Sequence, residues 1–166
     1  MIPGKIIRFL EERASIAFAG TRDANLVPRG HRVSGWLIGV GGRTLTAFVP
    51  ESSVPSLIES LQHNGRIALT FEELGSHETY QLKGRYLSHR PVQPTEIDVA
   101  TRARARFVKG IRALIPNQAI ADLVGPSIAA PSLAVEIEVD EVFLQTPGPG
   151  AGTRLAPPPD GKASAT

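Results

Sequence analysis

The stretch LTAFVPESSVPSLIESLQHNGRIALTFEELGSHETYQLK (residues 45–83) contains the pattern that decides the fold. Residues 45–49 alternate between two faces, as a strand does. Residues 54–64 repeat their apolar positions at the helical period. Residues 66–71 and 79–87 alternate again, which is typical of antiparallel strands. We therefore expect a strand, a small helix and two further strands in this order.

The start of this small helix is a candidate phosphate site. Ser52 and Ser53 lie where the first strand hands over to the helix. The first N–H groups of a helix have no partner within it, and the helix dipole is positive there, so a phosphate is well accommodated. Serine is also a common N-cap residue that needs no ligand. The stretch alone therefore favours a cap, and the rest of the chain has to decide.

The residues on the N-terminal side of this stretch predict one helix and two more strands. Residues 5–13 follow the helical period, and residues 15–19 form a short apolar strand that ends in a polar turn. The next strand covers residues 27–40. Gly30 and Gly35 lie inside it, and interior glycines of this kind mark a bend or a bulge.

The residues on the C-terminal side predict a second helix and a closing strand. The helix begins at Pro94-Thr95, with Thr95 and Asp98 as an approximate capping box, and ends before Pro116. A further short helix is expected over 117–124. The strand from residue 133 alternates strongly, and its phase changes at Asp140-Glu141, which predicts a bulge there.

These elements predict a mainly β protein with minor α content, namely a six-stranded antiparallel split β-barrel with small peripheral helices. Six twisted strands close readily into a barrel because closure removes exposed edges. Residues 1–146 would form this one domain. Residues 147–166 are rich in Pro, Gly and Ala, and we expect a disordered tail.

The composition excludes several classes of function. The 166-residue chain has a formal net charge of only +2 and no cysteine, so it offers neither a strongly basic nucleic-acid surface nor disulfides or thiolate metal sites. The histidines lack zinc spacing, and there is no Walker loop, nucleophile elbow or dinucleotide fingerprint. No run is apolar enough to span a bilayer, and we expect a cytoplasmic protein without a membrane or nucleic-acid partner.

The order of the elements resembles the FMN-binding split barrel of the pyridoxamine 5′-phosphate oxidase-like superfamily. Four segments carry the resemblance: SIAFAGTRD (15–23), LTAFVP (45–50), LQHNGRIALTF (61–71) and ETYQLKGRY (78–86). The resemblance implies a homodimer with FMN at the interface, and a flavin-dependent oxidoreductase acting on a small substrate or a nicotinamide donor.

The resemblance also implies which residues bind the cofactor. The nine residues are Arg32, Val33, Ser34, Thr46, Phe48, Ser52, Ser53, Gln81 and Lys83. The first three would meet the isoalloxazine ring, the next two would flank the ring and the ribityl chain, and the two serines would meet the phosphate. Gln81 and Lys83 would reach the flavin or its phosphate from the partner subunit. Without the resemblance, these two residues would be the solvated face of an edge strand.

One position departs from the family pattern. The family places an Arg or Lys just inside the small helix, where this chain has Val54-Pro55-Ser56. Arg32, Arg43 or Lys83 could compensate. The alternatives are therefore a non-catalytic flavin or haem binder or sensor, with His31 as a candidate haem ligand, a deazaflavin protein, or a barrel without a cofactor. The sequence identifies no catalytic residue.

Overall fold

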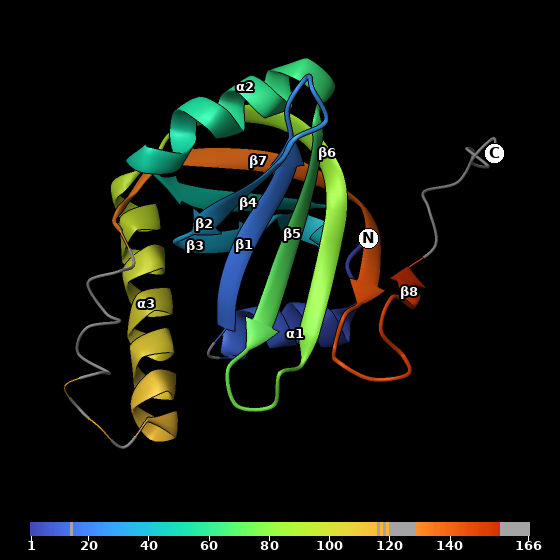
Figure 1. Ribbon diagram of the computed structural model, residues 1–166. Helices are drawn as coiled ribbons and strands as arrows, with labels where there is room; N and C mark the ends of the chain where they lie inside the picture. Colours follow the sequence, from blue (N-terminus) through green and yellow to red (C-terminus); the bar gives the residue numbers. More distant parts are fainter. Residues whose placement is uncertain (14, 116, 118, 120–128, 157–166) are drawn as a thin grey trace.

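A computed structural model describes residues 1–13, 15–115, 117, 119 and 129–156. In this part of the chain one antiparallel eight-stranded sheet curls around a core, with helices at its ends and side (Figure 1). The elements in chain order are α1 (Gly4–Glu12), β1 (Ser15–Arg22), β2 (Pro28–Val33), β3 (Gly35–Ile38), η1 (Val40–Gly42), β4 (Thr44–Pro50), η2 (Glu51–Ser53), α2 (Val54–Asn64), β5 (Arg66–Glu73), β6 (Thr79–Pro91), α3 (Pro94–Leu114), β7 (Pro131–Leu144) and β8 (Arg154–Ala156).

A bend at Ser34 closes the sheet into a split barrel. The strand order is β2-β1-β5-β6-β7-β4-β3, and β8 pairs with β7. β2 and β3 are the two halves of one bent strand, and between them the Ser34 N–H donates to the Phe48 carbonyl at 2.7 Å. Since β2 pairs with β1 and β3 pairs with β4, the bend joins the two edges of the sheet.

The predicted mainly β, split-barrel fold class is confirmed, but the strand count of six is wrong. The structure has eight strands because the strand expected over 27–40 divides at Ser34, and because β8 forms as well. β8 lies within the segment that we expected to be a disordered tail, and it pairs with β7. Residues 157–166, and most of the short helix expected over 117–124, lie outside the described residues.

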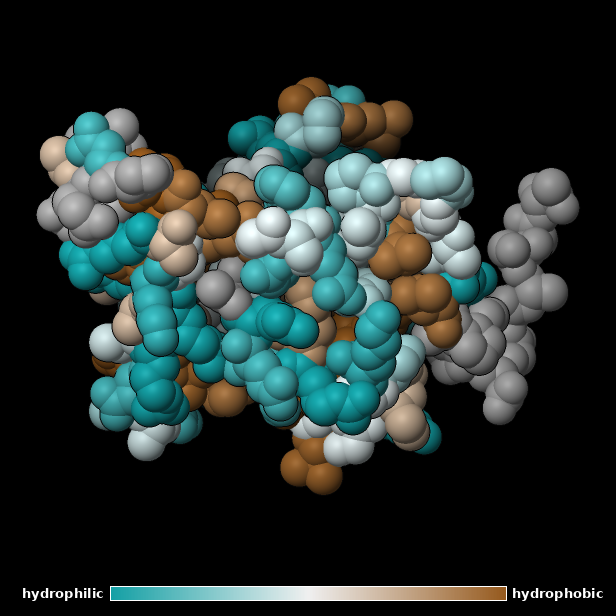
Figure 2. All heavy atoms as spheres, turned by 90° about the horizontal axis from the view of Figure 1, so that it is seen from below, coloured by the Kyte–Doolittle hydropathy of each residue, from teal (hydrophilic) through white to brown (hydrophobic). Residues whose placement is uncertain are grey.

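The core fills the barrel, and two helices close its ends. Leu57 and Leu61 of α2 are 0% and 1% exposed and cover one end. Phe9 of α1 covers the other end, where its ring packs edge to face on Tyr80 at 4.9 Å between centroids. The opposite side of α1 carries exposed Arg8, and the molecule seen from this end is mainly hydrophilic (Figure 2). Among the described residues, no helix is long and apolar enough to cross a membrane.

The predicted bulge in the closing strand is confirmed. Lys83 pairs with Glu141 and Gly84 pairs with Val139, so Asp140 has no partner position on β6. The backbones approach so closely here that a Cβ on Gly84 would lie 2.0 Å from the Glu138 carbonyl oxygen. A glycine is therefore required at position 84 on β6.

Helix α3 lies along the side of the barrel, over β3 (Figure 1). The capping box expected from Thr95 and Asp98 is wrong, because Gln93 and Glu96 form it two residues earlier. Glu96 accepts a hydrogen bond from the Gln93 N–H at 2.8 Å and pairs with both terminal nitrogens of Arg90 at 2.6 and 2.8 Å. This buried glutamate therefore anchors the N-terminal turn of the helix.

Candidate functional site

The outer face of β2, β1, β5, β6 and β7 brings three of the nine predicted residues together. Arg32, Phe18, Thr70, Gln81 and Phe143 are successive cross-strand neighbours and form one row across these strands. The Gln81 amide donates to the Thr70 hydroxyl at 3.1 Å, and the Phe18 ring is 44% exposed. This row therefore offers an aromatic surface beside an oriented amide.

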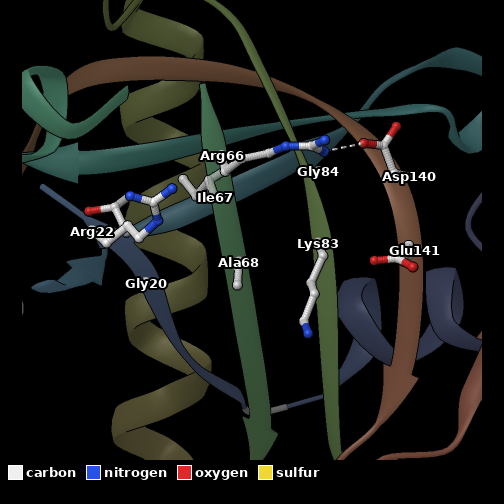
Figure 3. A pocket seen from close by; sticks show the side chains of 10 residues that line it. Gly20, Arg22, Arg66, Ile67, Ala68, Lys83, Gly84, Asp140 and Glu141 are labelled. Carbon is white, nitrogen blue, oxygen red and sulfur yellow. Dashed lines mark hydrogen bonds and ion pairs between the residues drawn. The ribbon is translucent and has the colours of Figure 1, made fainter. Parts of the chain in front are cut away.

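The next row on the same face is hollow. It consists of Gly20, Ala68, Lys83 and Glu141, again as cross-strand neighbours. Because the first two residues have almost no side chain, an open groove of about 490 Å³ lies over β1 and β5 (Figure 3). This volume lies within the range of small-molecule sites. We call this hollow the outer groove.

Basic residues surround the outer groove. Arg22 lies two residues beyond Gly20 and Arg66 lies two residues before Ala68, so both side chains start from the same face as Lys83. Sequence reasoning missed both arginines, although this spacing of two was available as a signal. The Lys83 ammonium lies 4.5 Å from the centroid of the Phe143 ring, a cation–π contact.

The acidic residues of the groove already have cationic partners. Asp140 accepts hydrogen bonds from Arg66 and from Arg85, each at 3.2 Å, and Glu141 pairs with Arg154. The hydrogen bond to Asp140 and the negative charge of this carboxylate raise the pKa of the Arg85 guanidinium. Within the described residues, the cationic groups of Arg22 and Lys83 have no carboxylate partner.

The predicted ring-binding residues lie beneath α3. The Arg32 guanidinium lies between the rings of Phe18 and Phe107, 5.5 and 5.6 Å from their centroids, and burial lowers the pKa of Arg32. Val33 faces the core, and the Ser34 hydroxyl donates to the Ala129 carbonyl at 2.9 Å. The cavity beside these residues measures about 20 Å³, room for a water molecule but not for a flavin ring.

The two predicted residues on β4, Thr46 and Phe48, lie on a different part of the barrel wall from the outer groove. Phe48 is 0% exposed and packs with Ala100 of α3 and Ala134 of β7. Thr46 is half-buried on the same face and pairs with Glu136 across β7. In this arrangement α3 covers Phe48, so a ligand reaches this residue only if the helix moves.

The expected phosphate corner lacks positive charge. Ser52 is exposed and Ser53 is buried at the junction of η2 and α2. Ser53 occupies the N-cap position of α2, as the cap interpretation predicts, but its side chain makes no cap hydrogen bond. Glu51 occupies the first turn of η2, and a carboxylate at a helix start satisfies the dipole that a phosphate would otherwise use.

His31 is unsuited to bind a haem in this arrangement. Its ring is 5% exposed, and Nε2 lies 3.3 Å from the Thr21 hydroxyl. Burial lowers the pKa of this imidazole, with a smaller effect from neighbouring Arg29. The described residues contain no cluster of three or more side chains that could hold a metal ion.

The fold of this chain is similar to the folds of several solved structures. HupZ of Group A Streptococcus aligns with a TM-score of 0.55 at 15% identity, over 92% of this chain and 100% of the other. A pyridoxamine 5′-phosphate oxidase-related, FMN-binding protein of Nostoc punctiforme aligns with a TM-score of 0.51 at 10% identity, over 90% and 87%. An F420 reductase aligns with a TM-score of 0.50 at 11% identity, over 81% and 94%.

No family model and no curated protein matches the sequence. The structural similarity nevertheless defines the class of protein by its fold. The chain shares the split-barrel fold of these solved structures, one of which is described as a pyridoxamine 5′-phosphate oxidase-related, FMN-binding protein.

Proposed function

We propose that this protein binds FMN on the outer face of the barrel, between two copies of the chain, and serves as a flavin-dependent oxidoreductase for a small substrate. The observation that carries the proposal is the row of Arg32, Phe18 and Gln81 beside exposed Lys83, on a sheet face that is open over the groove. Solved structures of the same fold include a protein described as FMN-binding, which supports the choice of cofactor.

The residues of this face suit a phosphorylated flavin in three respects. A planar ring can lie against Phe18, whose side chain is 44% exposed, and the outer groove beside it lets the rest of the ligand approach the strands. The Gln81 amide can donate to or accept from the polar edge of the ring. The Lys83 ammonium adds positive charge, which stabilises both a phosphate and a reduced anionic flavin.

Of the remaining predicted residues, half-buried Thr46 would come from the other copy, whereas α3 covers Phe48. Thr46, Phe48, Ser52 and Ser53 lie on β4 and at the start of α2, away from the groove of the same chain. A dimer in which β4 of one chain faces β6 of its partner would bring the two groups to one ligand. FMN, when bound, supplies the hydride or electron transfer, whereas the chain provides binding, orientation and exclusion of water.

Replacement of Lys83 tests the proposal. Lys83→Ala removes a charge from the open face without touching the core, so we expect FMN affinity to fall about tenfold while the unfolding temperature is unchanged. Quenching of FMN fluorescence measures the affinity. Lys5→Ala, which removes the same charge from a 75% exposed side chain in α1, is the control and should bind as the unchanged protein does. FMN binding that is absent, or equal in all three proteins, would contradict the proposal.

The spectrum of the purified protein separates the proposed cofactor from its alternatives. A flavin absorbance that a reduced nicotinamide bleaches supports the oxidoreductase, whereas a flavin that resists bleaching supports a binding or sensing role. A Soret band would indicate that the protein binds haem instead of flavin. Titration with a deazaflavin in place of FMN tests the remaining candidate.

A further inference from the structure

We infer that Arg22, Arg66 and Lys83 hold the phosphate of the bound cofactor in the outer groove, in place of the cation that is missing from the start of α2. This inference rests on the proposed function, because it assigns the phosphate group of that cofactor. It moves the phosphate away from the Ser52-Ser53 corner.

The shape of the groove admits a phosphate close to the backbone. Arg22 and Arg66 lie beside the hollow row, with the Arg66 side chain extended toward Asp140, and Lys83 projects from the row itself (Figure 3). A Cβ added to Gly20 would meet only the Ala68 carbonyl oxygen, at 3.8 Å, so the floor between the cations is open. Asn64 fixes the rim, since its side-chain amide donates to the Arg22 carbonyl at 2.9 Å.

The charges of the groove leave cations available for an anion. Asp140 lines the groove, but its carboxylate is shared between Arg66 and Arg85 and its side chain is only 17% exposed. Arg66 itself is 67% exposed and contacts Asp140 only through Nη1, which leaves its other N–H groups free to donate. Arg22 and Lys83 have no carboxylate partner in the described part of the chain.

The start of α2, at Ser52 and Ser53, is electrostatically less favourable for a phosphate than the outer groove. The residues at the start of α2 are Ser53, Val54 and Pro55, and Glu51 precedes them with a negative charge. Proline has no N–H to donate, and a nearby carboxylate repels a phosphate dianion. A phosphate therefore gains more from two or three guanidinium and ammonium groups than from this helix start.

Comparison of FMN with riboflavin tests the inference, because the two differ only in the phosphate. We expect the unchanged protein to prefer FMN by at least about tenfold, since each charge-assisted contact contributes about that factor. Arg22→Ala and Arg66→Ala should each remove most of this preference and leave riboflavin affinity unchanged. Arg8→Ala removes an exposed arginine of α1, outside the groove, and should retain the preference.

The outcomes separate this inference from the proposed function. If FMN binds tightly but the two groove variants behave like Arg8→Ala, the phosphate lies elsewhere and only the inference fails. If no flavin binds, a titration with inorganic phosphate tests whether the groove binds an anion. Phosphate binding that is lost in Arg22→Ala would support the groove as the phosphate site. Absence of binding by both FMN and phosphate would overturn both.

Discussion

His31 is the residue whose burial most directly affects the pH dependence of stability. Its imidazole is 5% exposed, contacts Thr21 and lies near Arg29, and burial lowers its pKa. The unfolded chain therefore binds a proton more readily than the folded one. The stability that this residue contributes is present above the ordinary histidine pKa of about 6.5 and is lost as the pH falls towards the folded value.

Replacement of His31 by glutamine should remove this part of the pH dependence. Gln can keep a hydrogen bond to Thr21 but does not titrate, so His31→Gln should lose less free energy of unfolding than the unchanged protein between neutral and mildly acidic pH. Urea unfolding above and below pH about 6.5 measures the difference. An equal loss in both proteins would show that another group is responsible.

The arrangement of helix α3 on the barrel depends on close packing at one glycine. A Cβ on Gly35 would lie 2.9 Å from the Ala100 Cα and 3.3 Å from the Phe48 ring. The helix is tied at its N-terminal turn by Glu96 and, further along, by Phe107 against Arg32. Its docking therefore combines one tight backbone contact with a few side-chain anchors.

Gly35→Ala should displace α3 from β3. Overpacking of this kind costs about 1–3 kcal/mol, and we expect faster amide hydrogen exchange in α3 together with a lower unfolding temperature. Gly30→Ala is the matched control, since a Cβ there meets nothing within 4 Å. Unchanged exchange in Gly35→Ala would mean that the helix adjusts without leaving the sheet.

The strands were predictable from the sequence because alternation has a period of two. This period placed Gln81 and Lys83 on the outer face and located the bulge at Asp140 through a change of phase. Alternation also separated Phe48 from the face of Leu45, Ala47 and Val49, but it says nothing about a helix from a distant part of the chain. The cover by Ala100 therefore could not be read from the pattern.

Other features depend on contacts between segments far apart in the sequence. The bend at Ser34 arises where one strand changes from pairing with β1 to pairing with β4, and the sequence shows only the glycine beside it. The basic rim of the groove unites Arg22, Arg66 and Lys83 from three strands. The position of each residue within its own strand could be predicted from the sequence. That the three residues lie together could be seen only once the strand order was known.

At the scale of the whole molecule, we propose that the site is shared between two chains. One chain presents the row of Phe18 and Gln81 and the outer groove on one part of the barrel wall, whereas Thr46 lies on another. Phe18 is a large apolar side chain that is 44% exposed, as expected of a surface that a partner covers. We therefore expect the protein to be a homodimer in solution and its cofactor to depend on that dimer.

Sedimentation velocity recorded both at the protein absorbance and at the visible flavin absorbance tests this directly. A protein of 17.7 kDa per chain, loaded with FMN, should sediment with its flavin signal on a species of twice the chain mass. Flavin that stays unsedimented, or that travels with a single chain, would contradict a shared FMN site on the outer face of the barrel.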